Sequence, residues 1–99
     1  MTLIEPWESI EQGEQFETEL LREVSESHPL YGKEITAIAR RFDCDDVLFQ
    51  VAGGEKTYFV VVHLTWKMKV EAKGYPCCEF FESLKEFETK RMTHDHKMY

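Results

Sequence analysis

Residues 28–66, HPLYGKEITAIARRFDCDDVLFQVAGGEKTYFVVVHLTW, decide the fold. β-Branched and aromatic residues dominate the end of this segment, and residues of these types favour strands. Two groups of turn-forming residues interrupt it, at 43–46 (DCDD) and 53–56 (GGEK). The pattern predicts three antiparallel strands, at residues 33–42, 47–52 and 57–66, joined as a meander.

The segments on either side of this sheet favour helices. Residues 7–26 have apolar side chains at helical spacing, and Ser9 with Gln12 three positions later fits a capping box. This helix must end before Pro29, because a residue that precedes proline avoids the α region. Gly13, on the apolar side of the helix, indicates either a close approach to the sheet or a break.

The last quarter of the chain has weaker signals. Residues 67–74 either extend the third strand or form a loop, and residues 75–81 are a candidate fourth strand. A second capping box at Ser83 predicts a short helix over residues 84–92. Residues 93–99 are expected to be a frayed tail.

These elements predict a single α+β domain over residues 1–99. Its antiparallel meander of three or four strands is packed by an acidic N-terminal helix and a short C-terminal helix. A chain of 99 residues with 42% hydrophobic residues is long enough for one core without disulfides or metals.

The two turns also predict a register. The second turn places Asp46 opposite His63, and the first places Phe42 opposite Val47. One face of the sheet then carries the bulky apolar side chains, and we expect both helices to cover it. The other face is mixed and gathers Arg41, Asp46 and His63 at one corner.

This polar cluster of Arg41, Asp46 and His63 is the first candidate site. A carboxylate that orients a histidine is the arrangement of a general base, because imidazole titrates near neutral pH. No activated nucleophile accompanies it in the sequence; Thr65 has no visible activating partner. A cross-strand ion pair with a hydrogen-bonded histidine accounts for the same residues. No catalytic residue is therefore assigned.

Metal ligation is the second candidate chemistry. His63, His94, Asp95 and His96 are suitable ligand types for zinc or manganese. The spacing in His94-Asp95-His96 also suits adventitious binding of metal by a tail. The acidic turn at 43–46 lacks the glycine and glutamate spacing of an EF-hand. We predict no cofactor.

The three cysteines predict reduced thiols. Cys77 and Cys78 are adjacent, a spacing at which a normal disulfide is strained, and Cys44 has no further partner. Either of the adjacent thiols is a nucleophile only if a neighbouring base lowers its pKa. Tyr75 and Pro76 do not do so, and His63 does so only if the fold brings it close. Free thiols indicate a reducing, cytoplasmic location.

Charge restricts the partners. The net charge is −7, and residues 1–28 account for all of it, with eight glutamates and one arginine. Such a balance disfavours nucleic acid and anionic membranes, which bind clustered lysine and arginine. We expect no signal peptide, and no apolar run in the sequence is long enough to span a membrane. The acidic segment is either a solvated helix face or a surface for a basic protein.

Three short sequence motifs resemble those of a known protein family. They are HPLYG at residues 28–32, ARRFDCDDVLF at 39–49 and HLTW at 63–66. Together they resemble a family of small, functionally uncharacterised bacterial proteins, with the patterns HPL-x-G, ARR-x-D-x-DDVLF and HLTW. The resemblance implies a bacterial, cytoplasmic, single-domain protein and carries no catalytic assignment.

Two functions fit these observations. The first is a non-enzymatic protein-interaction or regulatory module, of an immunity-like kind, acting through the acidic N-terminal helix or an edge strand. Residues 35–41 are a candidate edge, which could also pair with a second copy. The alternative is a small metal-binding or hydrolytic domain that uses the polar face of the sheet.

Overall fold

The computed structural model describes residues 2–72 and 75–99. These residues form an antiparallel sheet of five strands in the order β1-β2-β3-β4-β5. The strands are β1 (Trp7–Ser9), β2 (Glu34–Arg41), β3 (Asp46–Gly53), β4 (Lys56–His63) and β5 (Cys77–Phe81). The α+β class and the antiparallel meander are confirmed, although the sheet has more strands than the predicted three or four.

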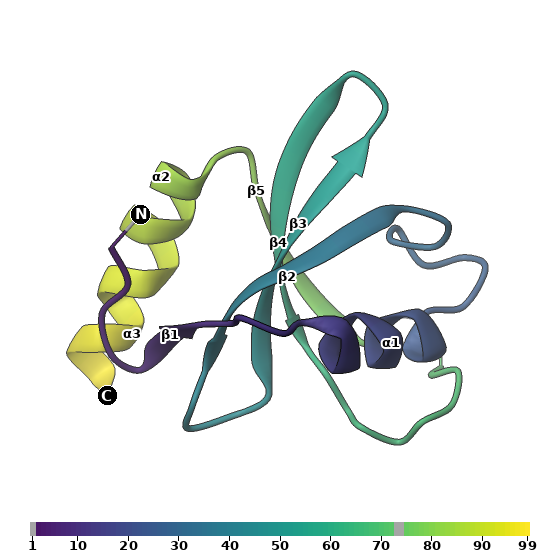
Figure 1. Cartoon of the computed structure of the whole chain (residues 1–99), viewed down its shortest axis with the longest axis horizontal. Coiled ribbons are helices and arrows are strands. Elements are labelled where there is room, and N and C mark those ends of the chain that lie inside the picture. The colour runs from purple at the N-terminus through teal and green to yellow at the C-terminus, as the bar shows by residue number, and fades with distance from the viewer. Residues whose placement is uncertain (1, 73–74) are drawn as a thin grey trace.

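Helices flank the sheet on two sides. They are α1 (Glu14–Glu23), α2 (Leu84–Phe87), a π-helical turn η1 (Glu88–Met92) and α3 (Thr93–Met98). The last three follow one another without a break, and we call them together the C-terminal helix. Figure 1 shows the C-terminal helix and α1 on opposite sides of the sheet, with the N-terminus beside the C-terminal helix. Among the described residues, no helix is long and apolar enough to cross a membrane.

The hairpin of β3 and β4 has the predicted register. Gly53 pairs with Lys56 and Asp46 with His63, so the connecting loop is two residues long. Gly54 within it has a φ of 74°, a left-handed conformation that favours glycine. The turn residues therefore fix which side chains of both strands share a face.

The pairing of β2 with β3 differs from the prediction. Arg40, not Phe42, lies opposite Val47, and the register shifts between Ala37 and Ala39. A bulge of this kind inserts one extra residue and reverses the side-chain alternation of the strand. Phe42 consequently leaves the core and is 43% exposed. The sequence patterns of turns do not report such an insertion.

The predicted start of the first helix is wrong. Trp7 and Ser9 pair with β2 instead, so Ser9 does not cap a helix. Helix α1 begins only after Gly13, where a Cβ would lie 2.9 Å from the Cβ of Ala37. Glycine is needed there because the chain passes so close to β2.

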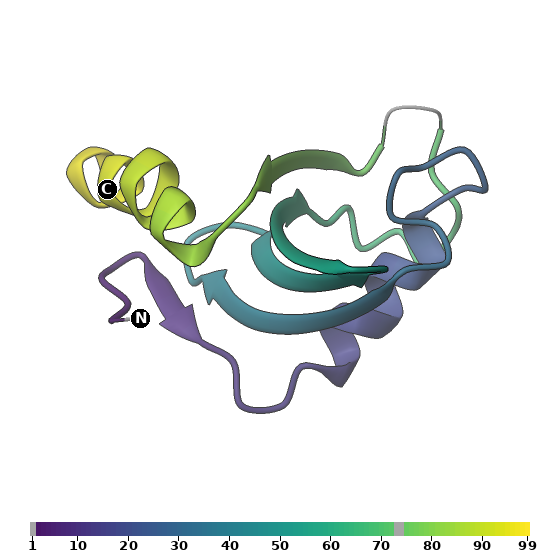
Figure 2. The ribbon, with the colours of Figure 1, turned by 90° about the horizontal axis from the view of Figure 1, so that it is seen from above.

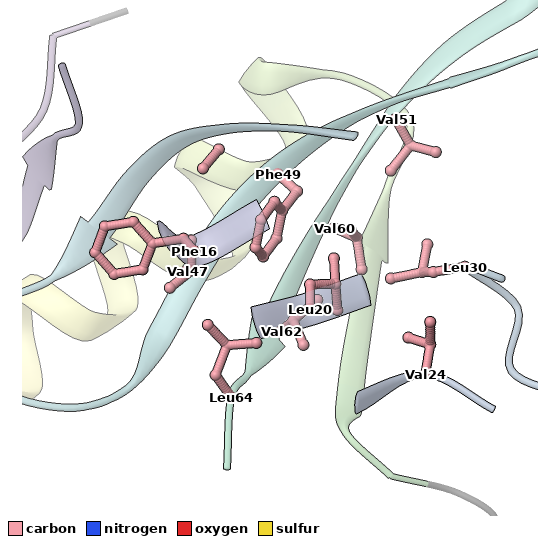
Figure 3. Close-up of a cluster of buried hydrophobic side chains, with 11 residues drawn as sticks. Phe16, Leu20, Val24, Leu30, Val47, Phe49, Val51, Val60, Val62 and Leu64 are labelled. Atoms are coloured by element: carbon pink, nitrogen blue, oxygen red, sulfur yellow. The ribbon is translucent and has the colours of Figure 1, made fainter. Parts of the chain in front are cut away.

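One core lies between α1 and the sheet. Figure 3 shows side chains of α1 pointing at those of β3 and β4. Its buried members include Phe16, Leu20, Val24, Leu30, Val47, Phe49, Val51, Val60, Val62 and Leu64. Burial of this many apolar side chains, at about 1.5–3 kcal/mol each, holds α1 to the sheet.

A second core lies on the other face. Its buried members are Trp7, Ala39, Leu48, Val61, Phe81, Phe87 and Met92. Phe87 of the C-terminal helix packs edge to face on Trp7, with ring centroids 5.0 Å apart. The prediction that both helices cover one face is therefore wrong, because β3 and β4 are apolar on both faces. Figure 2 shows the bent sheet with the C-terminal helix at one end.

The C-terminal helix extends beyond its predicted end. Ser83 caps it as predicted, since its hydroxyl accepts a hydrogen bond from the backbone N–H of Glu86 at 3.1 Å. Residues 93–98, predicted to fray, continue the helix, and Asp95 among them is 5% exposed. Residues 67–72 form a loop; the rest of the predicted extension, 73–74, lies outside the described residues.

The sheet edges also differ from the prediction. Residues 35–41 were expected at an edge, but β1 pairs with the end of β2, from Ala39 to Arg41. The outermost strands of the described sheet are therefore β1, with three residues, and β5, with five.

Candidate functional site

The predicted pair of Asp46 and His63 is in contact. The two residues lie opposite each other on β3 and β4, and Nδ1 of His63 is 2.8 Å from Oδ1 of Asp46. A carboxylate only accepts hydrogen bonds, so we assign the proton of this contact to Nδ1. The other ring nitrogen, Nε2, is then the basic one in the neutral imidazole. The side chain of His63 is 58% exposed.

Arg41 has other partners. Its guanidinium makes two hydrogen bonds to the carboxylate of Asp43, at 2.8 and 2.7 Å, and lies 3.3 Å from Oδ1 of Asp95. The bond to Asp43 raises the pKa of Arg41 and lowers that of Asp43. Arg41 thus lies in the same region as Asp46 and His63 but holds the turn and the C-terminal helix instead.

Arg91 is the residue that joins the cluster. From the C-terminal helix it donates to Asp95 at 2.9 Å, to Glu79 at 3.0 Å and to Asp46. Burial lowers its pKa, but the charges of Asp95 and Asp46 outweigh burial and raise it. Arg91 lies within the helix predicted over residues 84–92, but nothing in the sequence pattern shows which strand that helix crosses.

Asp95 is the most buried member of the group. The indole N–H of Trp7 donates to its Oδ2 at 2.8 Å, in addition to the contacts with Arg41 and Arg91. These contacts join β1, β2 and α3 at one carboxylate. We call the whole connected group the ion network; it consists of Arg41, Asp43, Asp46, His63, Glu79, Arg91 and Asp95.

Cys77 adds a thiol beside this network. It is exposed and lies opposite His63 in the pairing of β4 with β5. A small cavity of about 190 Å³ is lined by both side chains together with Asp46, Glu79 and Arg91. The sequence named Cys77 and His63 separately; only the pairing of β4 with β5 brings them together.

The other two thiols are less exposed than Cys77, although Cys78 also lines this cavity. Cys78 is partly buried, and burial raises its pKa to about 12. Its neighbour His28 accepts the N–H of Leu30 at Nδ1, so Nε2 carries the proton and donates to the carbonyl of Pro76 at 3.0 Å. His28 is thus engaged in holding the start of β5. Burial also raises the pKa of Cys44.

The predicted metal ligands do not converge in the described part of the chain. Asp95 is occupied by Trp7 and two arginines, and Nδ1 of His96 donates to the carbonyl of Glu5 at 2.7 Å. Within residues 2–72 and 75–99, no three His, Cys, Asp or Glu side chains are placed to hold a metal ion together.

Helix α1 carries a second polar cluster that the sequence did not predict. Glu19 and Glu23 are buried, although the helix was expected to expose its acidic face. Glu23 accepts the backbone N–H groups of Thr65 and Trp66, and Glu19 accepts that of Met68. Trp66 and Met68 have φ values of 58° and 59°, a conformation that aims neighbouring N–H groups at one anion.

Glu23 holds its proton more strongly than an ordinary carboxyl group. Burial first, and then the neighbouring Glu19, raises the pKa of Glu23 from 4.5 to about 7. The N–H groups of Thr65 and Trp66 act in the opposite direction but do not cancel this. Through these backbone contacts Glu23 and Glu19 fix the loop after β4 to α1.

No family model matches the chain, and neither a curated protein nor a solved structure is detectably similar to it. The resemblance of the motifs at residues 28–32, 39–49 and 63–66 to those of small bacterial proteins stays a prediction. Function is inferred from the geometry alone.

Replacing Asp95 by asparagine tests the ion network. Asp95→Asn leaves two partly buried guanidinium groups without their shared anion, so we expect the free energy of unfolding to fall by roughly 2–4 kcal/mol. The matched control is Asp43→Asn, which removes a more exposed partner of Arg41 and should cost much less. Urea denaturation of both variants measures the difference; equal losses would contradict this ranking.

Stability should also depend on pH through Glu23. The unfolded chain ionises this group near 4.5 and the folded chain near 7. Its proton therefore stabilises the fold below pH 4.5, and this contribution is lost as pH rises to about 7. The difference between 4.5 and about 7 corresponds to roughly 3 kcal/mol of unfolding free energy, at 1.36 kcal/mol per pKa unit.

Glu23→Gln mimics the protonated carboxyl and should remove this dependence. Urea denaturation between about pH 4.5 and 7 should show the wild-type curve falling relative to that of the variant. Glu14→Gln, an exposed change in the same helix, should follow the wild type. Parallel curves for wild type and Glu23→Gln would refute the raised pKa of Glu23.

Proposed function

We propose that this protein is a protein-interaction module that binds an extended segment of a partner by adding a strand to β5. The observation that carries the proposal is the position of β5. It pairs with β4 on one side and is the outermost strand of the described sheet on the other. An edge strand offers backbone N–H and C=O groups, which an added strand can pair with.

Side-chain recognition is supported by an open cleft beside this strand. The cleft has a volume of about 620 Å³ and lies between the end of β5 and the C-terminal helix. It is lined by Tyr58, Phe80, Phe81, Glu82, Glu86 and Lys90. Tyr58 and Phe80 pack with ring centroids 6.1 Å apart, and Phe80 is still 45% exposed. Exposed aromatic side chains are frequent anchors of protein interfaces.

Charge favours a basic partner. Glu82 and Glu86 line the cleft against the single ammonium of Lys90, which lies 3.9 Å from Glu86. The whole chain has a net charge of −7, which attracts cationic segments and repels acidic ones. We therefore propose that the bound segment alternates basic with apolar or aromatic side chains. Alternate side chains of an extended segment point to the same side, so the side chains of one of these two types enter the cleft.

The acidic helix α1 is a weaker docking surface than β5. Three of its carboxylates, on Glu17, Glu19 and Glu23, accept backbone N–H groups of this same chain. These groups are used to build the fold and are not free to bind a partner. A regulatory or immunity-like role, in which this protein covers a basic surface of its partner, is compatible with binding at β5.

Selection from a library of random linear peptides tests this proposal. Peptides enriched by the wild-type protein should combine basic and apolar residues and should bind Phe80→Ala at least about tenfold more weakly, because the anchor is lost. The control is Phe42→Ala, which is equally exposed and also packs on a tyrosine, Tyr99, but lies at the turn after β2. No enrichment, or equal weakening by both changes, would refute binding at β5.

A further inference from the structure

Asp46, His63 and Cys77 form one row across three neighbouring strands. Asp46 of β3 is opposite His63, and His63 of β4 is opposite Cys77 of β5. Residues directly opposite each other in antiparallel strands point to the same face, with Cβ atoms roughly 4.5–5.5 Å apart. A carboxylate, an imidazole and a thiol therefore follow one another in that order.

The proton positions within this row allow His63 to accept the proton of the Cys77 thiol. Asp46 takes the proton of Nδ1, so Nε2 of His63 carries the free lone pair. The nitrogens lie at different corners of the ring, and β5 is on the opposite side of β4 from Asp46. Nε2 is therefore the nitrogen of His63 that can take a proton from Cys77, the residue opposite it on β5 and on the same cavity.

The ion network fixes the orientation of His63, the base of this row. Asp46 is held by Arg91, and Arg91 is held in turn by Asp95 and Glu79. The charged groups facing His63 in the described structure are therefore Asp46, Glu79 and Arg91, all of which line the same small cavity. His63 and Cys77 are both exposed, so a small molecule can reach both.

We propose that Cys77 is a thiol–disulfide exchange site for small disulfides, with His63 as its base and Asp46 as the residue that positions His63. His63 takes the proton of Sγ, and the thiolate attacks one sulfur of the disulfide R–S–S–R. A new S–S bond forms between Sγ of Cys77 and the attacked sulfur, while the S–S bond of the disulfide breaks and R–S⁻ leaves. The leaving thiolate takes the proton from the imidazolium, so one disulfide replaces another and no other oxidant is needed.

Thiol–disulfide exchange is the reaction that these groups can carry out alone. It needs a thiolate, a proton acceptor and access, and it develops no oxyanion that further donors must stabilise. The ion network supplies four carboxylates and two guanidinium groups, so its excess negative charge favours a cationic disulfide over an anionic one. This inference does not depend on the proposed function, although the adduct would sit on β5.

The exchange rate of the full-length reduced protein tests this site. The probes are cystamine, 2-hydroxyethyl disulfide and glutathione disulfide, which are cationic, neutral and anionic, and peptide mapping by mass spectrometry locates each adduct. At about pH 7 native Cys77 should react at least about tenfold faster than the same residue in the urea-unfolded chain. The rates should follow the order of the charges, with cystamine the fastest.

Two further measurements distinguish activation of Cys77 by a positioned base from reactivity that comes from exposure of the thiol alone. His63→Gln should lose the excess rate over the unfolded chain, and in the wild type the excess should disappear in acid solution, because a protonated imidazole cannot accept a proton. The pH profile needs no variant, so it decides the matter even if His63→Gln does not fold. A native rate equal to the unfolded one, or an excess that persists in His63→Gln, would overturn the proposal.

Discussion

The carboxylate of Asp95 is the interaction on which the arrangement of this protein depends. It accepts the indole N–H of Trp7 and faces the guanidinium groups of Arg41 and Arg91. Trp7 comes from β1, Arg41 from β2 and Asp95 from α3, so one buried anion joins both ends of the chain to the sheet. Apolar packing of Trp7 on Phe87 holds the same elements together, and the contacts of Asp95 fix how β1 and α3 lie on the sheet.

The chemistry at the surface follows from this buried contact. Arg91 is aligned by Asp95, and it then holds Asp46, which orients His63. The orientation of His63 therefore depends on the position of the C-terminal helix. At the other end of the molecule Glu23 plays a comparable part, since it binds backbone N–H groups of the loop after β4. Both helices are thus attached to the sheet by carboxylates as well as by apolar packing.

The sequence predicted those parts that short-range patterns determine. The Gly-Gly turn and the β-branched run give the hairpin of β3 and β4 with its register, and hence the contact of Asp46 with His63. The cap at Ser83 is equally local. The β-bulge between Ala37 and Ala39, by contrast, depends on packing against two cores and leaves no mark in the alternation of residue types.

Long-range partners were not predictable in the same way. Ser9 and Gln12 match a capping box, but the pairing of Trp7–Ser9 with β2 is more favourable because it buries Trp7. Residues 93–98 look like a polar tail until Trp7 and Arg41 are placed beside Asp95. Arg91 reaches the site because the C-terminal helix crosses the sheet there, and Cys77 reaches it because β5 pairs with β4. Neither long-range contact can be recognised from local sequence patterns.

Hydrogen exchange of the Trp7 indole proton, followed by NMR, tests the central role of Asp95 most directly. The chain has only two tryptophans, and the partly exposed Trp66 serves as the internal reference in the same spectrum. If Asp95 holds β1 and the C-terminal helix together, the Trp7 indole proton should exchange as slowly as the amide protons of buried residues such as Leu48. Exchange of the Trp7 proton as fast as that of Trp66 would contradict this account.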